Sequence, residues 1–129
     1  MLKNNEITIF GNDNLREDAT NEGPILGGHN EVYVFNVETQ RVSTPYTEAM
    51  KSFDVRTTAE GLHKLLPNGD VFIEETLRGR LLRISKRNVV WQFTKKTSSH
   101  SISMLNWTRH LSKKYVEDML PIFKKVDEA

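Results

Sequence analysis

The sequence predicts an all-β fold of small antiparallel sheets, followed by one short C-terminal helix. Apolar and polar residues alternate with period two through residues 62–93, as in half-buried strands. Turn-forming residues interrupt this alternation, and a similar strand pattern occurs earlier in the chain. The 129 residues are enough for one domain of this kind, so we treat residues 1–129 as a single domain.

The clearest strands lie in residues 56–95, which we interpret as one complete four-stranded unit. Its first strand leads into Asn68-Gly69, a dipeptide that readily adopts the positive φ angles of a tight hairpin turn. Polar stretches then separate the apolar runs, which indicates further hairpins. The strands predicted after the turn are residues 71–75, 80–85 and 89–93.

A related but incomplete unit is predicted over residues 6–50. Val34 aligns with Leu81, and Tyr46 aligns with Phe93, because 81 − 34 and 93 − 46 both equal 47. A constant offset between two similar segments indicates an internal repeat. The repeat predicts that the first segment forms the same kind of hairpins as the second.

The first unit differs from the second by a long insertion. A strand at residues 7–10 is expected to be separated from its partner at residues 31–37 by a long loop over residues 11–30. A third repeat is expected to start at residues 101–110, where a new apolar stretch begins.

Antiparallel four-stranded units that recur every 40–50 residues are typical of β-propeller blades. At 47 residues per unit, this chain would hold about two and a half blades, fewer than a closed propeller needs. We therefore expect a partial propeller. A small β-sandwich or meander, in which the repeat reflects only hairpin spacing, is the alternative.

The hydrophobic period changes near the end of the chain and predicts an amphipathic helix over residues 111–125. Ser112 is a candidate N-cap, and Pro121 is expected to kink or end the first segment. We expect the helix to pack over an open sheet, although a partner-binding or membrane-surface helix is an alternative. The apolar positions are Leu111, Tyr115, Val116, Met119, Leu120, Ile122 and Phe123.

Composition excludes several classes of function. Eighteen basic and 17 acidic residues give a formal charge of +1, so nothing favours nucleic acid as a partner. No apolar run approaches the length of a transmembrane segment, and no apolar signal core follows Lys3. The chain has no cysteine, which excludes disulfides and thiolate chemistry.

No cofactor, metal or catalytic residue is predicted. The four histidines show none of the usual helical zinc-ligand spacings. The chain also lacks a Gly-x-Ser-x-Gly nucleophile elbow and a phosphate-binding glycine loop with its following lysine.

Candidate substrate-binding residues come from loops that adjoin the predicted inner strands. The segment before the strand at residue 62 combines a cation, hydroxyls and a carboxylate, which together could orient an anionic oxygen. Glu74 and Glu75 point to opposite faces of a strand and cannot form a catalytic pair, so a salt bridge to Arg80 or Arg83 is expected. The candidates are Arg56, Thr57, Thr58, Glu60, His63, Glu75 and Asn106.

Three segments resemble the C-terminal part of the bacterial, nucleotide-independent arylsulfotransferase family: residues 7–14, 56–83 and 105–109. The resemblance implies a β-propeller whose funnel binds an aryl sulfate. It also implies sulfuryl transfer to a phenol through a sulfated histidine, and a periplasmic or membrane-anchored setting. The partner would be an aryl sulfate or phenolic small molecule, bound once the missing blades complete the funnel.

The chain departs from the family pattern. In the family, the nucleophilic histidine precedes the strand that corresponds to residues 7–10, and the usual Phe-Asp-Asn is here Phe10-Gly11-Asn12. We therefore expect the chain to be inactive alone. The alternative is a non-catalytic ligand-binding or assembly module that forms a homo-oligomer through open blade edges.

Overall fold

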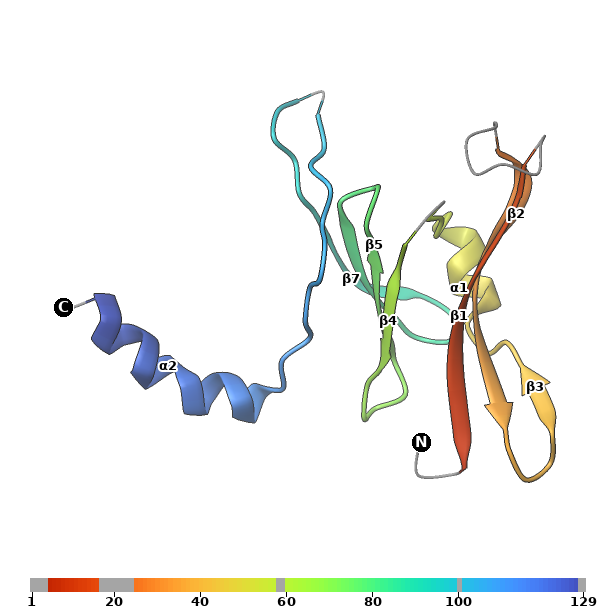
Figure 1. The fold of residues 1–129 in the computed structure, drawn as a ribbon, viewed down its shortest axis with the longest axis horizontal. Helices are drawn as coiled ribbons and strands as arrows, with labels where there is room; N and C mark the ends of the chain where they lie inside the picture. The colour runs from red at the N-terminus through yellow and green to blue at the C-terminus, as the bar shows by residue number, and fades with distance from the viewer. Residues whose placement is uncertain (1–4, 17–24, 58–59, 100, 128–129) are drawn as a thin grey trace.

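The computed structural model describes residues 5–16, 25–57, 60–99 and 101–127, which form two antiparallel sheets and two helices (Figure 1). One sheet has the strand order β1-β2-β3, and the other has the order β4-β5-β6-β7. The elements are β1 (Glu6–Arg16), β2 (Ile25–Asn36), β3 (Arg41–Ser43), α1 (Thr47–Ser52), β4 (Leu62–Leu65), β5 (Val71–Glu75), β6 (Arg80–Ile84), β7 (Val89–Thr94) and α2 (Lys113–Asp127).

The four-stranded sheet confirms the strands predicted in the second half of the chain. Its first hairpin turns at Gly69, which has a φ of +84° and donates a backbone hydrogen bond to the Leu66 carbonyl over 2.9 Å. The Asn68 side chain donates to Asp70 over 2.7 Å and stabilises the same turn. The Asn-Gly signal therefore set the register of β4 against β5.

The prediction of a loop over residues 11–30 is wrong in the parts that the structure describes, residues 11–16 and 25–30. There β1 continues to Arg16 and pairs with β2 from its start at Ile25. Polar side chains pair across this extension: Asn30 donates to Asn12 over 2.8 Å, and the Tyr33 hydroxyl donates to Asp13 over 2.8 Å. Such polar cross-strand pairs leave no apolar alternation from which a strand could be recognised.

Sheet β1-β2-β3 ends differently from its counterpart, because a helix follows β3. Tyr46 aligns with Phe93 of β7, yet it is buried and lies at the start of α1. Its hydroxyl donates to the Gly69 carbonyl over 2.7 Å, and burial raises the pKa of its phenol. This hydrogen bond ties the helix start to the first hairpin of the other sheet.

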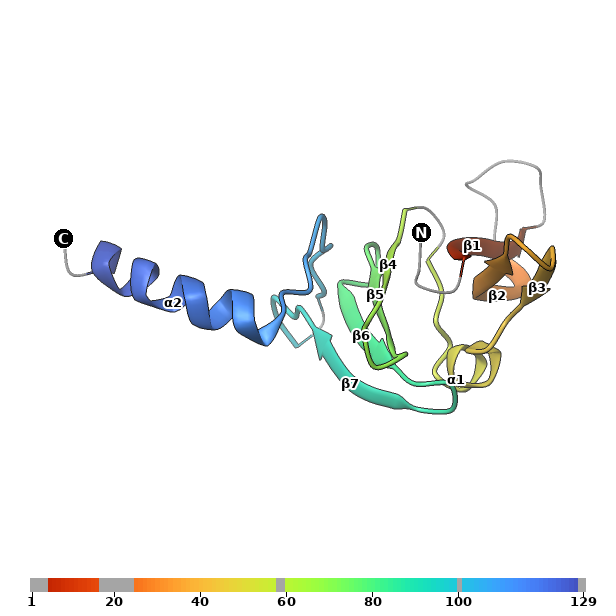
Figure 2. The ribbon, with the colours of Figure 1, turned by 90° about the horizontal axis from the view of Figure 1, so that it is seen from below.

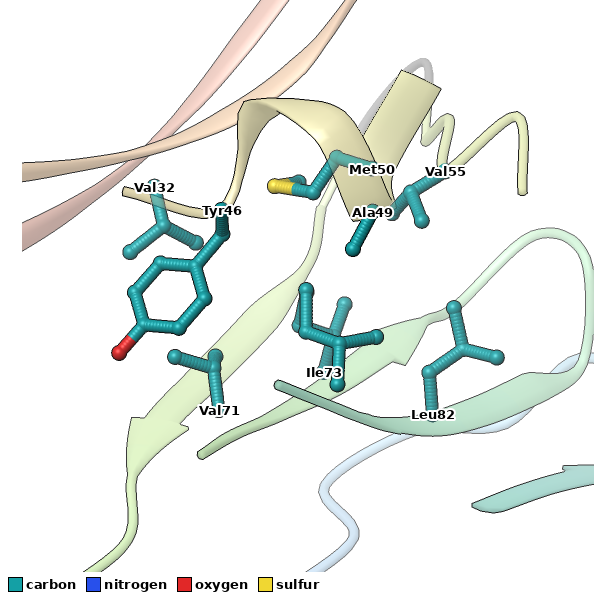
Figure 3. Close-up of a cluster of buried hydrophobic side chains, with 9 residues drawn as sticks. Val32, Tyr46, Ala49, Met50, Val55, Val71, Ile73 and Leu82 are labelled. Atoms are coloured by element: carbon teal, nitrogen blue, oxygen red, sulfur yellow. The ribbon is translucent and has the colours of Figure 1, made fainter. Parts of the chain in front are cut away.

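A hydrophobic core joins the two sheets through α1 (Figure 3). Ile73 and Leu82 are neighbours on one face of the four-stranded sheet and are fully buried against the helix. Period-two alternation places Val71 and Ile84 on that same face. The core residues are Val32, Tyr46, Ala49, Met50, Val55, Val71, Ile73, Leu82 and Ile84.

Helix α2 confirms the predicted C-terminal helix but not its position. The Ser112 hydroxyl accepts a hydrogen bond from the Tyr115 amide over 3.2 Å, as expected of an N-cap. The helix continues through Pro121 and extends away from both sheets in both views, so the expected packing over a sheet is wrong (Figures 1 and 2). Tyr115 and Leu120 consequently stay about half exposed. Among the described residues, no helix is long and apolar enough to cross a membrane.

The segment between β7 and α2 crosses the four-stranded sheet without forming a regular strand. An isolated β-bridge pairs Lys96 with Ile102, and the Leu105 amide donates to the Thr76 carbonyl over 3.1 Å. A third propeller repeat at residues 101–110 therefore stays a prediction.

Candidate functional site

Glu74 holds the segment between β7 and α2 against the four-stranded sheet, and two pockets that share Leu62 lie beside it. This β5 side chain is fully buried. One carboxylate oxygen accepts hydrogen bonds from the Thr108 amide, over 2.8 Å, and from the Thr108 hydroxyl. The other oxygen accepts from the Thr76 hydroxyl over 3.0 Å. All three donors are neutral, so the ion pair with Arg80 or Arg83 that the sequence predicted for Glu74 does not form among the described residues.

The acidic pocket has a volume of about 300 Å³. Two of its wall residues, Glu60 and Trp107, hold left-handed backbone conformations with φ of 56° and 59°. Non-glycine residues in this region are strained, and such strain gathers at ligand sites. No residue in the described part of the chain forms an ion pair with either glutamate of the pocket. The lining residues are Glu60, Gly61, Leu62, Glu74, Thr76, Asn106 and Trp107.

The basic pocket adjoins it and has a volume of about 170 Å³. Lys64 is exposed and donates to the His110 carbonyl over 3.2 Å, while Arg109 lies 5.6 Å from the centre of the Trp107 ring. Within the described ranges, neither cation has a carboxylate partner. The Phe72 and His110 rings, 5.7 Å apart, supply an aromatic wall. The lining residues are Leu62, His63, Lys64, Phe72, Thr108, Arg109 and His110.

His63 combines a place in the basic pocket with a packing role. Its ring stacks on Phe10 of β1 with centroids 5.9 Å apart, so it joins the two sheets. The Nε2 atom is buried without a hydrogen-bond partner. Burial lowers the pKa of this histidine below its ordinary value of 6.5, because a charged ring would lose its solvation.

This burial predicts a pH-dependent stability that replacing His63 with phenylalanine should remove. The neutral ring stabilises the folded state fully above pH 6.5, and the contribution declines as pH falls below that value, because only the unfolded chain then takes up the proton. Urea unfolding at about pH 7.5 and about pH 5.5 should show a smaller acid loss in His63→Phe than in the wild type. Equal losses in the two proteins would contradict this assignment. The pKa values of Asp54 and Asp70 are also lowered, but these carboxyl groups change the stability only near pH 3.8 and below, outside the range of this comparison.

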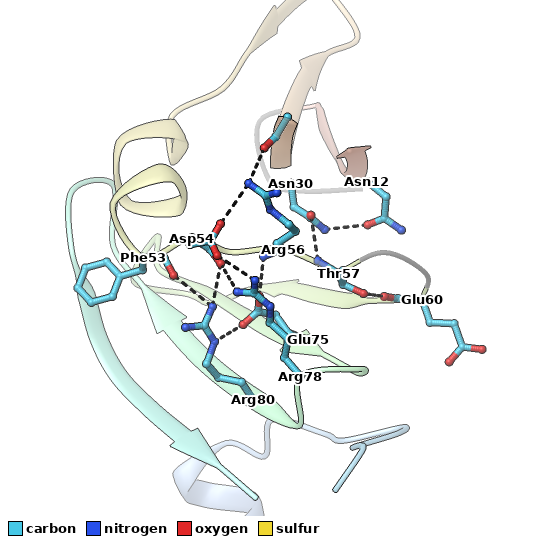
Figure 4. A network of polar contacts seen from close by, with 11 residues as sticks. Asn12, Asn30, Phe53, Asp54, Arg56, Thr57, Glu60, Glu75, Arg78 and Arg80 are labelled. Carbon is cyan, nitrogen blue, oxygen red and sulfur yellow. Dashed lines mark hydrogen bonds and ion pairs between the residues drawn. The ribbon is translucent and has the colours of Figure 1, made fainter. Parts of the chain in front are cut away.

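Several candidate residues take part in a polar network outside both pockets (Figure 4). Glu75 is fully buried and forms the expected ion pair with Arg80. It also accepts a hydrogen bond from the Arg56 amide over 2.6 Å. The Arg56 side chain donates to the Gly28 carbonyl over 3.0 Å and pairs with Asp54 over 3.2 Å. These contacts hold the segment before β4 between the two sheets.

Thr57 has a similar anchoring position. Its amide donates to the buried Asn30 side chain over 3.0 Å, and its hydroxyl donates to the Glu60 carbonyl. Thr57 thereby supports the strained backbone of Glu60, whose carboxylate points away from the network (Figure 4). Thr58 lies outside the described residues.

Of the candidates from the sequence, the structure places Glu60 and Asn106 in the acidic pocket and His63 in the basic pocket. Arg56, Thr57 and Glu75 line neither. Sequence reasoning missed Lys64, although period-two alternation puts it on the same face as Glu74. It also missed Arg109, because no periodic pattern around this residue assigns its side chain to a face of the sheet. Nowhere in the described chain do three or more metal-binding side chains gather.

In fold and site, the chain is a mostly antiparallel β protein with two adjoining pockets of opposite charge. The family model described as arylsulfotransferase (ASST) matches residues 2–96, well over half of the sequence. The chain therefore belongs to the arylsulfotransferase family. Neither the curated proteins nor the solved structures contain a match to it.

Proposed function

We propose that the chain is an arylsulfotransferase-like protein whose basic pocket holds the aryl sulfate. The observation that carries this proposal is that two cations, Lys64 and Arg109, line one pocket together with the Phe72 and His110 rings. Neither cation has a carboxylate partner among the described residues. A sulfate ester needs donors of this kind for its anionic oxygens, and its ring needs an apolar surface. Family membership supports the same substrate class.

Among the described residues we assign substrate binding but no nucleophile. His63 is stacked on Phe10, His110 packs against Phe72, and His29 lies 3.4 Å from a Glu31 oxygen. A histidine that attacks sulfur needs an accessible neutral nitrogen aimed at the substrate. We therefore propose that this chain binds aryl sulfate without transferring the sulfuryl group, and that it represents the C-terminal, blade-bearing part of a family propeller.

Titration with 4-nitrophenyl sulfate tests this assignment. Lys64→Gln and Arg109→Gln are each expected to weaken binding by about two- to fivefold, the range for partly exposed charge pairs. The matched control is Lys51→Gln, because Lys51 is an exposed lysine on α1. Unchanged binding in both pocket variants, or equal weakening in the control, would contradict the proposal.

A second candidate function is a non-catalytic assembly module. The observation that favours it is the exposed apolar surface of the edge strand β7, where Val90, Trp91 and Phe93 are about half exposed. Unpaired sheet edges with apolar side chains promote association. Sedimentation equilibrium would show a self-associating species if this function holds, and a strictly monomeric chain would eliminate it.

A further inference from the structure

The acidic pocket carries an electrostatic feature that aryl sulfate binding does not use. We propose that it binds a small aromatic ammonium ion, with the charged nitrogen toward Glu60 and Glu74 and the ring against Trp107. This inference goes beyond the proposed function, because it concerns a separate pocket and a ligand of opposite charge.

Glu74 is a buried carboxyl group without a cationic partner among the described residues. Burying a carboxylate is costly unless a cation compensates for it. The neighbouring Glu75 shows the usual solution, since Arg80 pairs with it. Glu74 is equally buried but receives only neutral donors, and no cation pairs with it in the part of the chain that the structure describes.

The pocket wall supplies a second carboxylate, that of Glu60. Glu60 is exposed, which gives an entering ligand direct access to its charge. None of the lining residues is a lysine, arginine or histidine. Two carboxylates and no basic side chain in the lining favour an ammonium ion over a carboxylate or sulfate, although the Arg109 guanidinium lies 5.6 Å from the centre of the Trp107 ring.

The volume of the acidic pocket and the Trp107 side chain in its wall determine what the rest of the ligand can be. A pocket of about 300 Å³ lies at the small end of ligand sites and suits one substituted ring. Trp107 is 69% exposed, so its indole offers a free surface for stacking. The Arg109 guanidinium lies 5.6 Å from the centre of the same indole, so the ligand ring can stack only on the part of the indole that Arg109 leaves exposed.

The test uses three probes of similar size on the full chain: phenethylamine, 2-phenylethanol and 3-phenylpropionate. Binding is read from the NMR shift of the Trp107 indole N–H, which a Trp91→Phe variant distinguishes from the other tryptophan. Phenethylamine, a cation at neutral pH, is expected to bind at least about tenfold more tightly than the carboxylate, and added salt should weaken it.

Two variants locate the interaction. Glu60→Gln keeps the side-chain shape at an exposed position and should weaken phenethylamine by about two- to fivefold, whereas Glu48→Gln on α1 should have no effect. Equal binding of the three probes, or phenethylamine binding that Glu60→Gln leaves unchanged, would overturn the proposal. Because phenethylamine carries no sulfate, these results are independent of 4-nitrophenyl sulfate binding in the basic pocket.

Discussion

Replacing Glu75 with alanine is expected to lower the free energy of unfolding by about 3–5 kcal/mol, the usual cost of removing one partner of a buried ion pair. The change leaves the Arg80 guanidinium without its carboxylate, and it leaves the Arg56 amide without its acceptor. Both groups lie at the junction of the two sheets, so the segment before β4 should loosen as well. Urea denaturation at neutral pH measures the effect.

The control for this change is Glu48→Ala. Glu48 is an exposed glutamate in the first turn of α1 and forms none of the ion pairs of the described residues. Its replacement should alter stability by no more than about 0.5 kcal/mol. If Glu75→Ala lowered the free energy of unfolding no more than the control does, Glu75 would not anchor the network. A role in substrate binding would then be favoured for Glu75.

Replacing Ile73 with alanine is expected to lower the free energy of unfolding by about 2–5 kcal/mol, because it removes a fully buried side chain and leaves a cavity. Ile73 lies between Leu82 and the residues of α1, in the core that joins the sheets (Figure 3). A loss of this size is a large part of the 5–15 kcal/mol that stabilises an ordinary domain.

The matched control is Ile102→Ala, which shortens an isoleucine that is 54% exposed. It should cost no more than about 0.5 kcal/mol. Comparable losses at the two positions would mean that the core does not lie between α1 and the four-stranded sheet.

Local patterns predicted the four-stranded sheet well, because its strands combine period-two alternation with a strong turn at Asn68-Gly69. The same rule failed in the first sheet, where polar pairs such as Asn12 with Asn30 hold the hairpin. The position of α2 also escaped prediction. An amphipathic pattern specifies an apolar face, but it does not specify which surface covers that face.

Apart from Asn106, the candidate-site residues that were predicted from the sequence adjoin a recognisable strand. Glu60 and His63 were found because they flank the start of β4. Lys64 and Arg109 face the same pocket from segments far apart in sequence, and the crossing segment that carries Arg109 has no periodicity. Glu75 was chosen from its loop-end position, but its burial and the ion pair with Arg80, which the sequence had predicted, keep it out of both pockets.

The measurement that tests the central claim most directly is to incubate the purified chain with 4-nitrophenyl sulfate and a phenol. Binding is followed by NMR, release of 4-nitrophenolate by absorbance, and protein sulfation by mass spectrometry. The account predicts saturable shifts at Lys64 and Arg109, no sulfated histidine and no 4-nitrophenolate above the uncatalysed rate. Catalytic release of 4-nitrophenolate, or saturable binding that leaves both residues unaffected, would contradict it.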